Sequence, residues 1–394
     1  MTTQPGTSPL LVNTPKTFAQ MLAHLHQQHI LALDTESDSL YSYFPKICLI
    51  QLSAPAHVDD PNPLAVVDFL VDPLRLGDLA PLGELFSSPQ VEVIMHASEN
   101  DMLLLYRNFG FTFGCVFDTQ LAARILGWKQ VGLAAILENQ FGIVSDKRMQ
   151  RTNWGKRPLT PQQIAYAQMD THYLLALREK LITELKGRHR WEEAQDAFAH
   201  LAQIDYAQRQ TEERTFWNMK STREVPLTQL GVLETLWRWR EDEARRQDRP
   251  PFKVVTDQIL IEVAKTLPGD RAALGQVPGL SDNQDERYGA ALLRAVQEGR
   301  THPQPRFPEA ELRPENALDR PGLARYDALR KWRSEKATVR DVAPDIVLPN
   351  STLLAIALRN PTSEVDLLTI PDLGPWKVRT YGAEILATLH GRQP

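Results

Sequence analysis

The sequence predicts a mixed α/β domain, in which helices pack on a sheet, followed by two small all-helical domains. In the first half, short apolar runs of strand character come first and then alternate with helical patterns. After about Gln210 no strand-like alternation is convincing, and the helical patterns are broken by Pro and Gly. The helical half also repeats itself at a constant spacing. A chain of 394 residues is too long for one ordinary core, so two or three domains are expected.

The elements of the α/β part follow from apolar periodicity and from helix caps. Strands are expected at 29–36, 47–52, 65–71, 91–95 and 115–117, and helices at 17–28, 78–86, 98–108 and 119–126. A further helix begins after Thr160, because a Thr cap followed by Pro161 and Gln163 is a strong start signal. We expect that helix to run through Lys180.

The helical half is an internal duplication with an offset of 93 residues (332 − 239). The segments that recur are Trp239-Arg240 with Trp332-Arg333, Val277-Pro278-Gly279-Leu280 with Ile370-Pro371-Asp372-Leu373, and Tyr288-Gly289-Ala290 with Tyr381-Gly382-Ala383. Two homologous domains explain the constant offset better than two unrelated bundles that share common residues. We therefore expect an α/β domain at 1–208, a first helical domain at 209–301, a Pro-rich linker at 302–315 and a second helical domain at 316–394.

Composition argues against several classes of protein. The net charge of −5 does not favour nucleic acid, so such a partner would be held by local basic patches. No apolar run approaches the roughly 20 residues that span a membrane, and the polar start lacks the basic region of a signal peptide. The two cysteines, Cys48 and Cys115, cannot make a disulfide framework or a zinc cluster. We expect a cytoplasmic protein with no membrane partner.

Two carboxylates close the first strand. Asp34 and Glu36 lie two residues apart, so their side chains point to the same face of an extended strand. Converging carboxylates repel each other unless a cation lies between them, and Mg²⁺ favours such oxygen ligands. The alternative is a strand that merely ends in solvated acids.

Two further sets of side chains fit the same crevice. Asp101 falls in the first turn of a helix capped by Ser98, at the end of the strand 91–95, where α/β sheets bind ligands. Alternatively, it only complements the helix dipole. Tyr166 and Asp170 share a face of the helix that begins after Thr160, because they are four residues apart. Such a pair is commonly a surface pair.

The ordered set of acids and motifs resembles the tyrosine subclass of the DEDD superfamily of 3′→5′ exonucleases, and within it the bacterial ribonuclease D family. The matching segments are Leu33-Asp34-Thr35-Glu36, Tyr43-Phe44-Pro45, Leu49-Ile50-Gln51-Leu52, His96 with Asp101, Phe117-Asp118-Thr119-Gln120, Arg157-Pro158-Leu159-Thr160 and Tyr166-x-x-x-Asp170. The helical repeat is similar to the HRDC domain. The residues Ala97 to Asn100 depart from the commonest pattern but leave the spacing of Asp101 intact.

The resemblance implies a ribonuclease H-like exonuclease fold and two divalent metal ions, Mg²⁺ or Mn²⁺, bound by Asp34, Glu36, Asp101 and Asp170. It implies that Asp34 bridges the ions, that Glu36 and Asp170 complete the site of the ion that activates water, and that Asp101 supports the second ion. Tyr166 would position the attacking water, since an unperturbed phenol with a pKa of about 10 is a poor base.

The implied function is the removal of nucleotides from RNA 3′ ends by two-metal-ion hydrolysis that releases 5′-mononucleotides. The implied partner is RNA with a free 3′ end, such as a tRNA precursor, and no protein partner is implied. One alternative is a DNA exonuclease of proofreading or repair type, because the same acids serve both. Another is a noncatalytic nucleic-acid-binding protein, which the presence of all four carboxylates and the tyrosine disfavours.

Nucleic-acid contacts are predicted from basic residues that surround an aromatic one. They are Lys147, Arg148, Arg151, Lys156 and Arg157 around Trp154. The alternative is a solvated loop with Trp154 turned into the core. Three aromatic residues that follow Glu36 could enclose the terminal nucleotide, namely Tyr41, Tyr43 and Phe44. For at least Phe44 we expect that the side chain packs against the protein instead.

The helical repeats carry two basic clusters and one hairpin suited to phosphate. The clusters are Arg238, Arg240, Arg245, Arg246 and Arg249 in the first repeat and Arg330, Lys331, Arg333, Lys336 and Arg340 in the second. In the second repeat, Ile370 to Lys377 resembles a helix-hairpin-helix turn, with Gly374 and Lys377 as phosphate contacts. The alternative is that these clusters are solvated faces of a scaffold. Because all five candidate catalytic residues lie between Asp34 and Asp170, we expect a fragment ending near Gln210 still to cleave a short unstructured RNA but to bind long or structured RNA more weakly.

Overall fold

The computed structural model describes residues 7–58, 60–207, 215–303, 305 and 318–391. The chain forms two compact units. One takes the described residues within Met1–Ser37, Ile47–Tyr206 and Pro314–Pro394, and the other those within Asp38–Lys46 and Ala207–Arg313. The second helical repeat therefore belongs to the same unit as the α/β domain. Most of the predicted linker lies outside the described residues.

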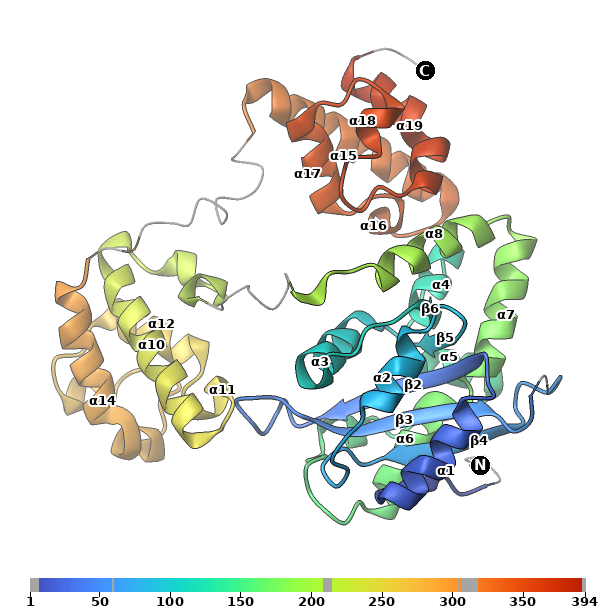
Figure 1. Ribbon diagram of the computed structural model, residues 1–394. Coiled ribbons are helices and arrows are strands. Elements are labelled where there is room, and N and C mark those ends of the chain that lie inside the picture. The colour runs from blue at the N-terminus through green and yellow to red at the C-terminus, as the bar shows by residue number, and fades with distance from the viewer. Residues whose placement is uncertain (1–6, 59, 208–214, 304, 306–317, 392–394) are drawn as a thin grey trace. The chain divides into compact units, whose positions relative to one another are not determined.

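The α/β domain is built on a six-stranded sheet with the order β1-β4-β3-β2-β5-β6 (Figure 1). Its strands are β1 Leu10–Val12, β2 Ile30–Ser37, β3 Ile47–Pro55, β4 Val66–Val71, β5 Glu92–Met95 and β6 Cys115–Asp118. β3 is antiparallel to β2 and β4, and the other three pairings are parallel. The predicted mixed sheet is thus confirmed. The edge strand β1 was not predicted, because three residues are too few to show a period.

Both faces of the sheet are buried, because alternate residues of β2 enter different cores. Leu31 and Leu33 pack with α1 and α3, while Ala32 packs with α4 and α7 on the opposite face. The helices of this domain are α1 Pro15–Leu25, α2 Ala80–Ser87, α3 Glu99–Phe109, α4 Thr119–Leu126, α5 Leu133–Phe141, the 3₁₀ helix η1 Lys147–Arg151, α6 Pro161–His172, α7 Leu174–Gly187 and α8 Trp191–Ala202. The sheet is therefore a rigid platform for the side chains at its ends.

The helix predicted from Thr160 through Lys180 is two helices. The predicted capping box is present, since Thr160 Oγ1 accepts the N–H of Gln163 at 3.2 Å. However, α6 ends at His172, and α7 begins at Leu174 after a turn residue. The length prediction was wrong because the polar and apolar pattern continues across that break.

The two helical repeats share the order of their α-helices, and most of these helices keep the 93-residue offset. The first contains the 3₁₀ helices η2 Phe216–Asn218, η3 Thr222–Glu224 and η4 Leu227–Gln229, then α10 Leu230–Gln247, α11 Pro251–Val254, α12 Asp257–Thr266, α13 Arg271–Leu274 and α14 Asp282–Thr301. The second contains α15 Arg320–Arg340, α16 Pro344–Val347, α17 Asn350–Arg359, α18 Glu364–Leu367 and α19 Pro375–Leu389. From α11 and α16 onward, each helix of the second repeat starts 93 residues after its counterpart (344 − 251).

A repeated arginine stabilises each of the two bundles from within. Arg240 is 4% exposed and donates to the carbonyl of Val255 at 3.2 Å. Its counterpart Arg333 is 8% exposed and donates to the carbonyl of Leu348 at 2.8 Å. These two arginines were predicted within phosphate-binding clusters, and that prediction was wrong, because both guanidinium groups are buried on backbone acceptors.

The segment Asp38–Lys46, which follows β2, packs on the first helical repeat. The hydroxyl of Tyr43 donates to Glu241 at 3.1 Å, and Asp248 accepts the backbone N–H of Tyr43 at 3.0 Å. Lys253 Nζ lies 4.1 Å from the ring centre of Tyr41. Contrary to the prediction, Phe44 is 55% exposed and Tyr43 is the packed aromatic residue.

Among the described residues, no helix combines the length and apolar character needed to cross a membrane.

Candidate active site

Three carboxylates from two elements meet at the end of β2. Asp34 and Glu36 come from that strand and pair with Gln51 and Leu49 of β3. Asp170 comes from α6, and ligand oxygens of the three residues all lie within 4.8 Å of one another. The period of two along the strand places Asp34 and Glu36 together, and the capped helix supplies the third acid.

Burial and mutual repulsion raise the pKa values of these acids in the metal-free protein. Burial is the largest cause for Asp34, whose pKa lies well above its usual range, and Asp101, Asp170 and Glu36 raise it further. Burial, Asp170 and Asp101 raise the pKa of Glu36 to about 9. Burial and Asp101 raise the pKa of Asp170 to about 8. Such a set of oxygen donors fits divalent cations, which would relieve the repulsion.

Asp101 reaches the site from the first turn of α3. Its carboxylate accepts a hydrogen bond from the hydroxyl of Thr35, the residue between the two strand acids. Burial raises its pKa to about 6, although the bond from Thr35 opposes this rise. Asp101 is not one of the three acids that share the 4.8 Å cluster, but its charge raises the pKa of each of them.

Asp118 fixes the turn that leads into α3. It accepts the backbone N–H of Ser98 at 2.7 Å and of Ala97 at 3.2 Å, and it also caps α4 through the N–H of Leu121 at 2.9 Å. Ala97 has a φ of 57°, an unfavourable conformation for a residue with a Cβ. The predicted cap by the Ser98 side chain is wrong, because its hydroxyl donates to Asp118 instead. The turn that orients Asp101 therefore depends on Asp118.

Tyr166 lies one turn before Asp170 on α6. Its side chain is hydrogen-bonded to the Asp170 carboxylate, and Gln150 bonds to its hydroxyl. Burial, followed by the charges of Asp170, Glu36 and Asp34, raises the pKa of Tyr166 above its usual range. The phenol is therefore protonated at neutral pH and acts as a hydrogen-bond donor.

A buried polar network, which the sequence analysis missed, anchors α6 to the sheet. Asp68 of β4 accepts from Gln168 Nε2 at 2.6 Å and lies 2.8 Å from His172 Nδ1. It also accepts from the hydroxyl of Ser53 at 2.6 Å, and that hydroxyl lies 2.7 Å from Thr171 Oγ1. A carboxylate inside the otherwise apolar strand VVDFLV was the available signal.

The predicted stacking of a base on Trp154 is wrong. Trp154 is 1% exposed and packs in a core cluster with Tyr166, at 6.1 Å between ring centres. Arg157 is also structural, since it donates to both oxygens of Asp72 and to the carbonyl of Cys48. The indole of Trp154 is directed inward because it packs against residues of α6 such as Tyr166. Arg148 is paired with Asp146, and Arg151 and Lys156 are exposed.

The predicted phosphate site at Gly374 and Lys377 is also wrong. Asp196 of α8 accepts the backbone N–H of Trp376 at 3.4 Å, and a Cβ at Gly374 would lie 2.1 Å from Asp196 Oδ2. A carboxylate of the chain itself thus occupies the end of α19 that was expected to meet phosphate. Burial lowers the pKa of Lys377. This hairpin docks the second repeat on α8.

Comparisons with protein families define the general class of protein to which this chain belongs. Residues 9–186 match the family model described as a 3'-5' exonuclease, and residues 229–296 and 322–389 each match the HRDC domain. Fold and acids therefore define a 3′→5′ exonuclease with two HRDC domains.

Full-length relatives then define the family. The chain is 31% identical to ribonuclease D of Gluconacetobacter diazotrophicus over 98% of this chain and 93% of the relative. It is 28% identical to ribonuclease D of Escherichia coli over 84% of each chain. The crystal structure of E. coli RNase D has the same fold, with a TM-score of 0.70, 24% identity and coverage of 98% of this chain and 100% of the other. The chain belongs to the ribonuclease D family.

The family confirms the predicted enzyme class, a 3′→5′ exoribonuclease of the ribonuclease D type. It also implies divalent metal ions, for which the clustered carboxylates supply suitable ligands.

Proposed function

We propose that this chain removes nucleotides from the 3′ end of RNA by hydrolysis with two divalent metal ions, Mg²⁺ or Mn²⁺, and releases 5′-mononucleotides. The observation that carries the proposal is the convergence of Asp34, Glu36 and Asp170 within 4.8 Å, with Asp101 close enough to raise their pKa values. Bound divalent ions supply Lewis-acid polarisation of the phosphate and lower the pKa of water.

The four carboxylates divide the work of holding the ions. Ligand oxygens of Asp34, Glu36 and Asp170 lie within 4.8 Å of one another, and Thr35, the neighbour of Asp34 in the chain, donates to Asp101. This position between the other acids supports Asp34 as a ligand that the two ions would share. Glu36 and Asp170 would hold the ion on one side, and Asp101, oriented by Thr35, would support the other.

Tyr166 acts as a positioning donor in this proposal. A protonated phenol fixed by Asp170 can orient a water for attack, whereas its raised pKa makes it unsuited to remove a proton. Asp68 and its partners hold the helix that carries both residues. In this proposal the acids supply the negative charge that binds the metal ions, and the tyrosine orients the attacking water.

Structured RNA, including tRNA precursors, is the proposed substrate. Support comes from the E. coli relative, whose crystal structure is described as that of an exoribonuclease involved in structured RNA processing. A cytoplasmic location is proposed as well, supported by two cysteines without disulfide bonds, Cys48 and Cys115.

The test compares matched RNA and DNA strands with free and blocked 3′ ends, in Mg²⁺ and in Mn²⁺, and identifies the products. We expect 5′-mononucleotides from RNA with a free 3′ end and no products from the blocked strand. Faster cleavage of DNA would favour the repair exonuclease. Cleavage of the blocked strand would overturn the 3′→5′ mechanism.

A further inference from the structure

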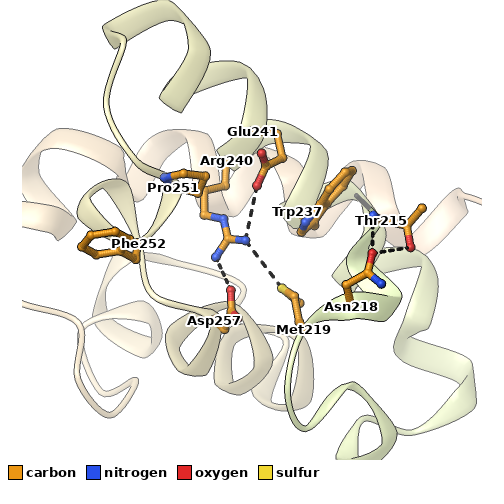
Figure 2. A pocket seen from close by; sticks show the side chains of 9 residues that line it. All are labelled: Thr215, Asn218, Met219, Trp237, Arg240, Glu241, Pro251, Phe252 and Asp257. Carbon is orange, nitrogen blue, oxygen red and sulfur yellow. Dashed lines mark hydrogen bonds and ion pairs between the residues drawn. The ribbon is translucent and has the colours of Figure 1, made fainter. Parts of the chain in front are cut away.

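The first helical repeat contains a cavity with an aromatic rim. Its volume is about 370 Å³, within the range of small-molecule sites. Trp237 of α10 and Phe252 of α11 line it, on opposite sides of the Arg240 guanidinium group (Figure 2). Phe252 is 49% exposed, although large aromatic residues are ordinarily buried. The cavity therefore offers flat apolar surfaces to a ligand.

Hydrogen-bond acceptors lie between these aromatic residues. Glu241 and Asp257 also line the cavity, and Arg240 donates to Asp257 Oδ1 at 2.5 Å. Asp257 nevertheless remains 45% exposed, so a ligand can reach its carboxylate. Arg240 is committed to the fold, because it also bonds to the carbonyl of Val255. The cavity is thus suited to a flat ligand that donates N–H groups.

The charges of the lining argue against phosphate as the group inside the cavity. Arg240 supplies one positive charge, and Glu241 and Asp257 supply two negative charges. The lining therefore suits a nucleobase, and the phosphates of a bound strand would remain outside the cavity.

The second repeat lacks the aromatic rim and has no carboxylates at the positions of Glu241 and Asp257, which separates ligand binding from the shared fold. At the 93-residue offset, Trp237 corresponds to Arg330, Phe252 to Asp345, Glu241 to Ser334 and Asp257 to Asn350. The hydrogen bond to the buried arginine is present in both repeats. Asn350 accepts from Arg333 at 2.8 Å, just as Asp257 accepts from Arg240. Asp345 instead pairs with Arg124 of the α/β domain. The fold of the second repeat thus forms without the aromatic rim and without carboxylates at the positions of Glu241 and Asp257, although Trp237 also packs against the core of its own bundle.

We propose that this cavity binds an unpaired guanine of single-stranded RNA. Guanine presents two neighbouring N–H donors on its Watson–Crick edge, which match a carboxylate, and its faces match Trp237 or Phe252. The proposal rests on RNA being the substrate, and it adds a base preference located outside the active site.

The test uses the full chain with Asp34→Asn, so that bound RNA is not degraded. Two fluorescent oligonucleotides with blocked 3′ ends are titrated by anisotropy, one of uridines only and one with a single central guanine. We expect about tenfold tighter binding of the guanine strand, the discrimination of one good base contact. Asp257→Asn should reduce the preference to less than twofold, and its fold is safeguarded because the second repeat uses Asn at this position.

The matched control lies in the second repeat. Trp237→Ala should remove the guanine preference, whereas Arg330→Ala, its counterpart, should leave it unchanged. Equal affinity for both strands, or a preference that survives Trp237→Ala and Asp257→Asn, would overturn the proposal. Displacement of the guanine strand by arginine amide but not by guanosine would assign the cavity to a cationic protein side chain, which also overturns it. Absence of binding to either strand would count against RNA as the substrate and not against the cavity alone.

Discussion

His172 Nδ1 lies 2.8 Å from Asp68 Oδ2, and this pair joins the end of α6 to β4 of the sheet. Both side chains are buried, and the same carboxylate oxygen accepts from Gln168 at 2.6 Å. These residues contact none of the reacting groups that we propose. They fix the axial position and rotation of the helix that presents Tyr166 and Asp170.

Asp68→Asn should weaken divalent-metal binding by about tenfold, the usual lower limit for loss of a residue that orients metal ligands. The amide keeps the size of the side chain but cannot accept all the bonds that converge on Asp68. Metal affinity is measured by calorimetry at fixed pH. Val66→Ala on the same strand is the matched control, because it destabilises the fold without touching the network. Equal losses of affinity in both variants would mean that Asp68 acts through stability alone.

The positions of the acidic site residues could be predicted from the sequence more accurately than the surroundings of the aromatic and basic residues. The positions of Asp34 and Glu36 follow from the period of a strand, which local sequence determines. Burial of Trp154 depends on its packing against Tyr166 of α6, and the closure of the Gly374 hairpin depends on Asp196, which is 180 residues from its partner Trp376 in the chain. Long-range partners such as these leave no periodic trace. The partners of Asp68 could not be predicted for the same reason, although a carboxylate inside an apolar strand was itself a visible signal.

Asp34→Asn should abolish hydrolysis while the protein remains folded. The variant should also raise the melting temperature of the metal-free protein at pH 8, because it removes a buried acid whose raised pKa makes the folded state less stable above the pKa of the unfolded chain. Hydrolysis of short RNA and thermal unfolding are measured on the same preparation. Near-normal turnover by a folded variant would remove Asp34 from the mechanism.

Tyr166→Phe should keep metal affinity and slow the chemical step by about 10²-fold, because only the hydroxyl that orients water is lost. Single-turnover rates at saturating metal separate chemistry from binding. If the variant instead keeps its rate and loses metal affinity, Tyr166 serves as a support for Asp170.

Stabilisation by Mg²⁺ should increase as the pH rises from 6 to 9. In the metal-free fold the pKa values are about 9 for Glu36 and about 8 for Asp170, against about 4 in the unfolded chain. The folded state therefore binds more protons than the unfolded state in this window, and the metal-free protein loses stability as the pH rises. Metal competes with these protons and cancels the repulsion. Melting temperatures with Mg²⁺ and with a chelator give the difference, and a difference independent of pH would contradict the assigned ligands.

Arg340→Ala should destabilise the unit that contains the α/β domain and the second repeat by about 3–5 kcal/mol. Arg340 donates to Glu193 Oε1 at 2.9 Å, and the Glu193 side chain is only 2% exposed, so the variant leaves a buried charge without its partner. Ile346 of the second repeat also packs in a core cluster of the α/β domain. We therefore expect a fragment ending near Gln210 to be unstable, contrary to the expectation from sequence.

The exposed pair Lys129–Asp341 joins the same two domains and provides the control, since both of its side chains are more than 70% exposed. Lys129→Ala should cost less than about 1 kcal/mol. The double variant Arg340→Met with Glu193→Leu should recover much of the stability lost in Arg340→Ala, because no buried charge remains. Chemical denaturation of the full chain measures all of these variants. Equal effects of Arg340→Ala and Lys129→Ala would show that the second repeat is held to α8 by its apolar contacts and by Asp196, without a contribution from the buried ion pair.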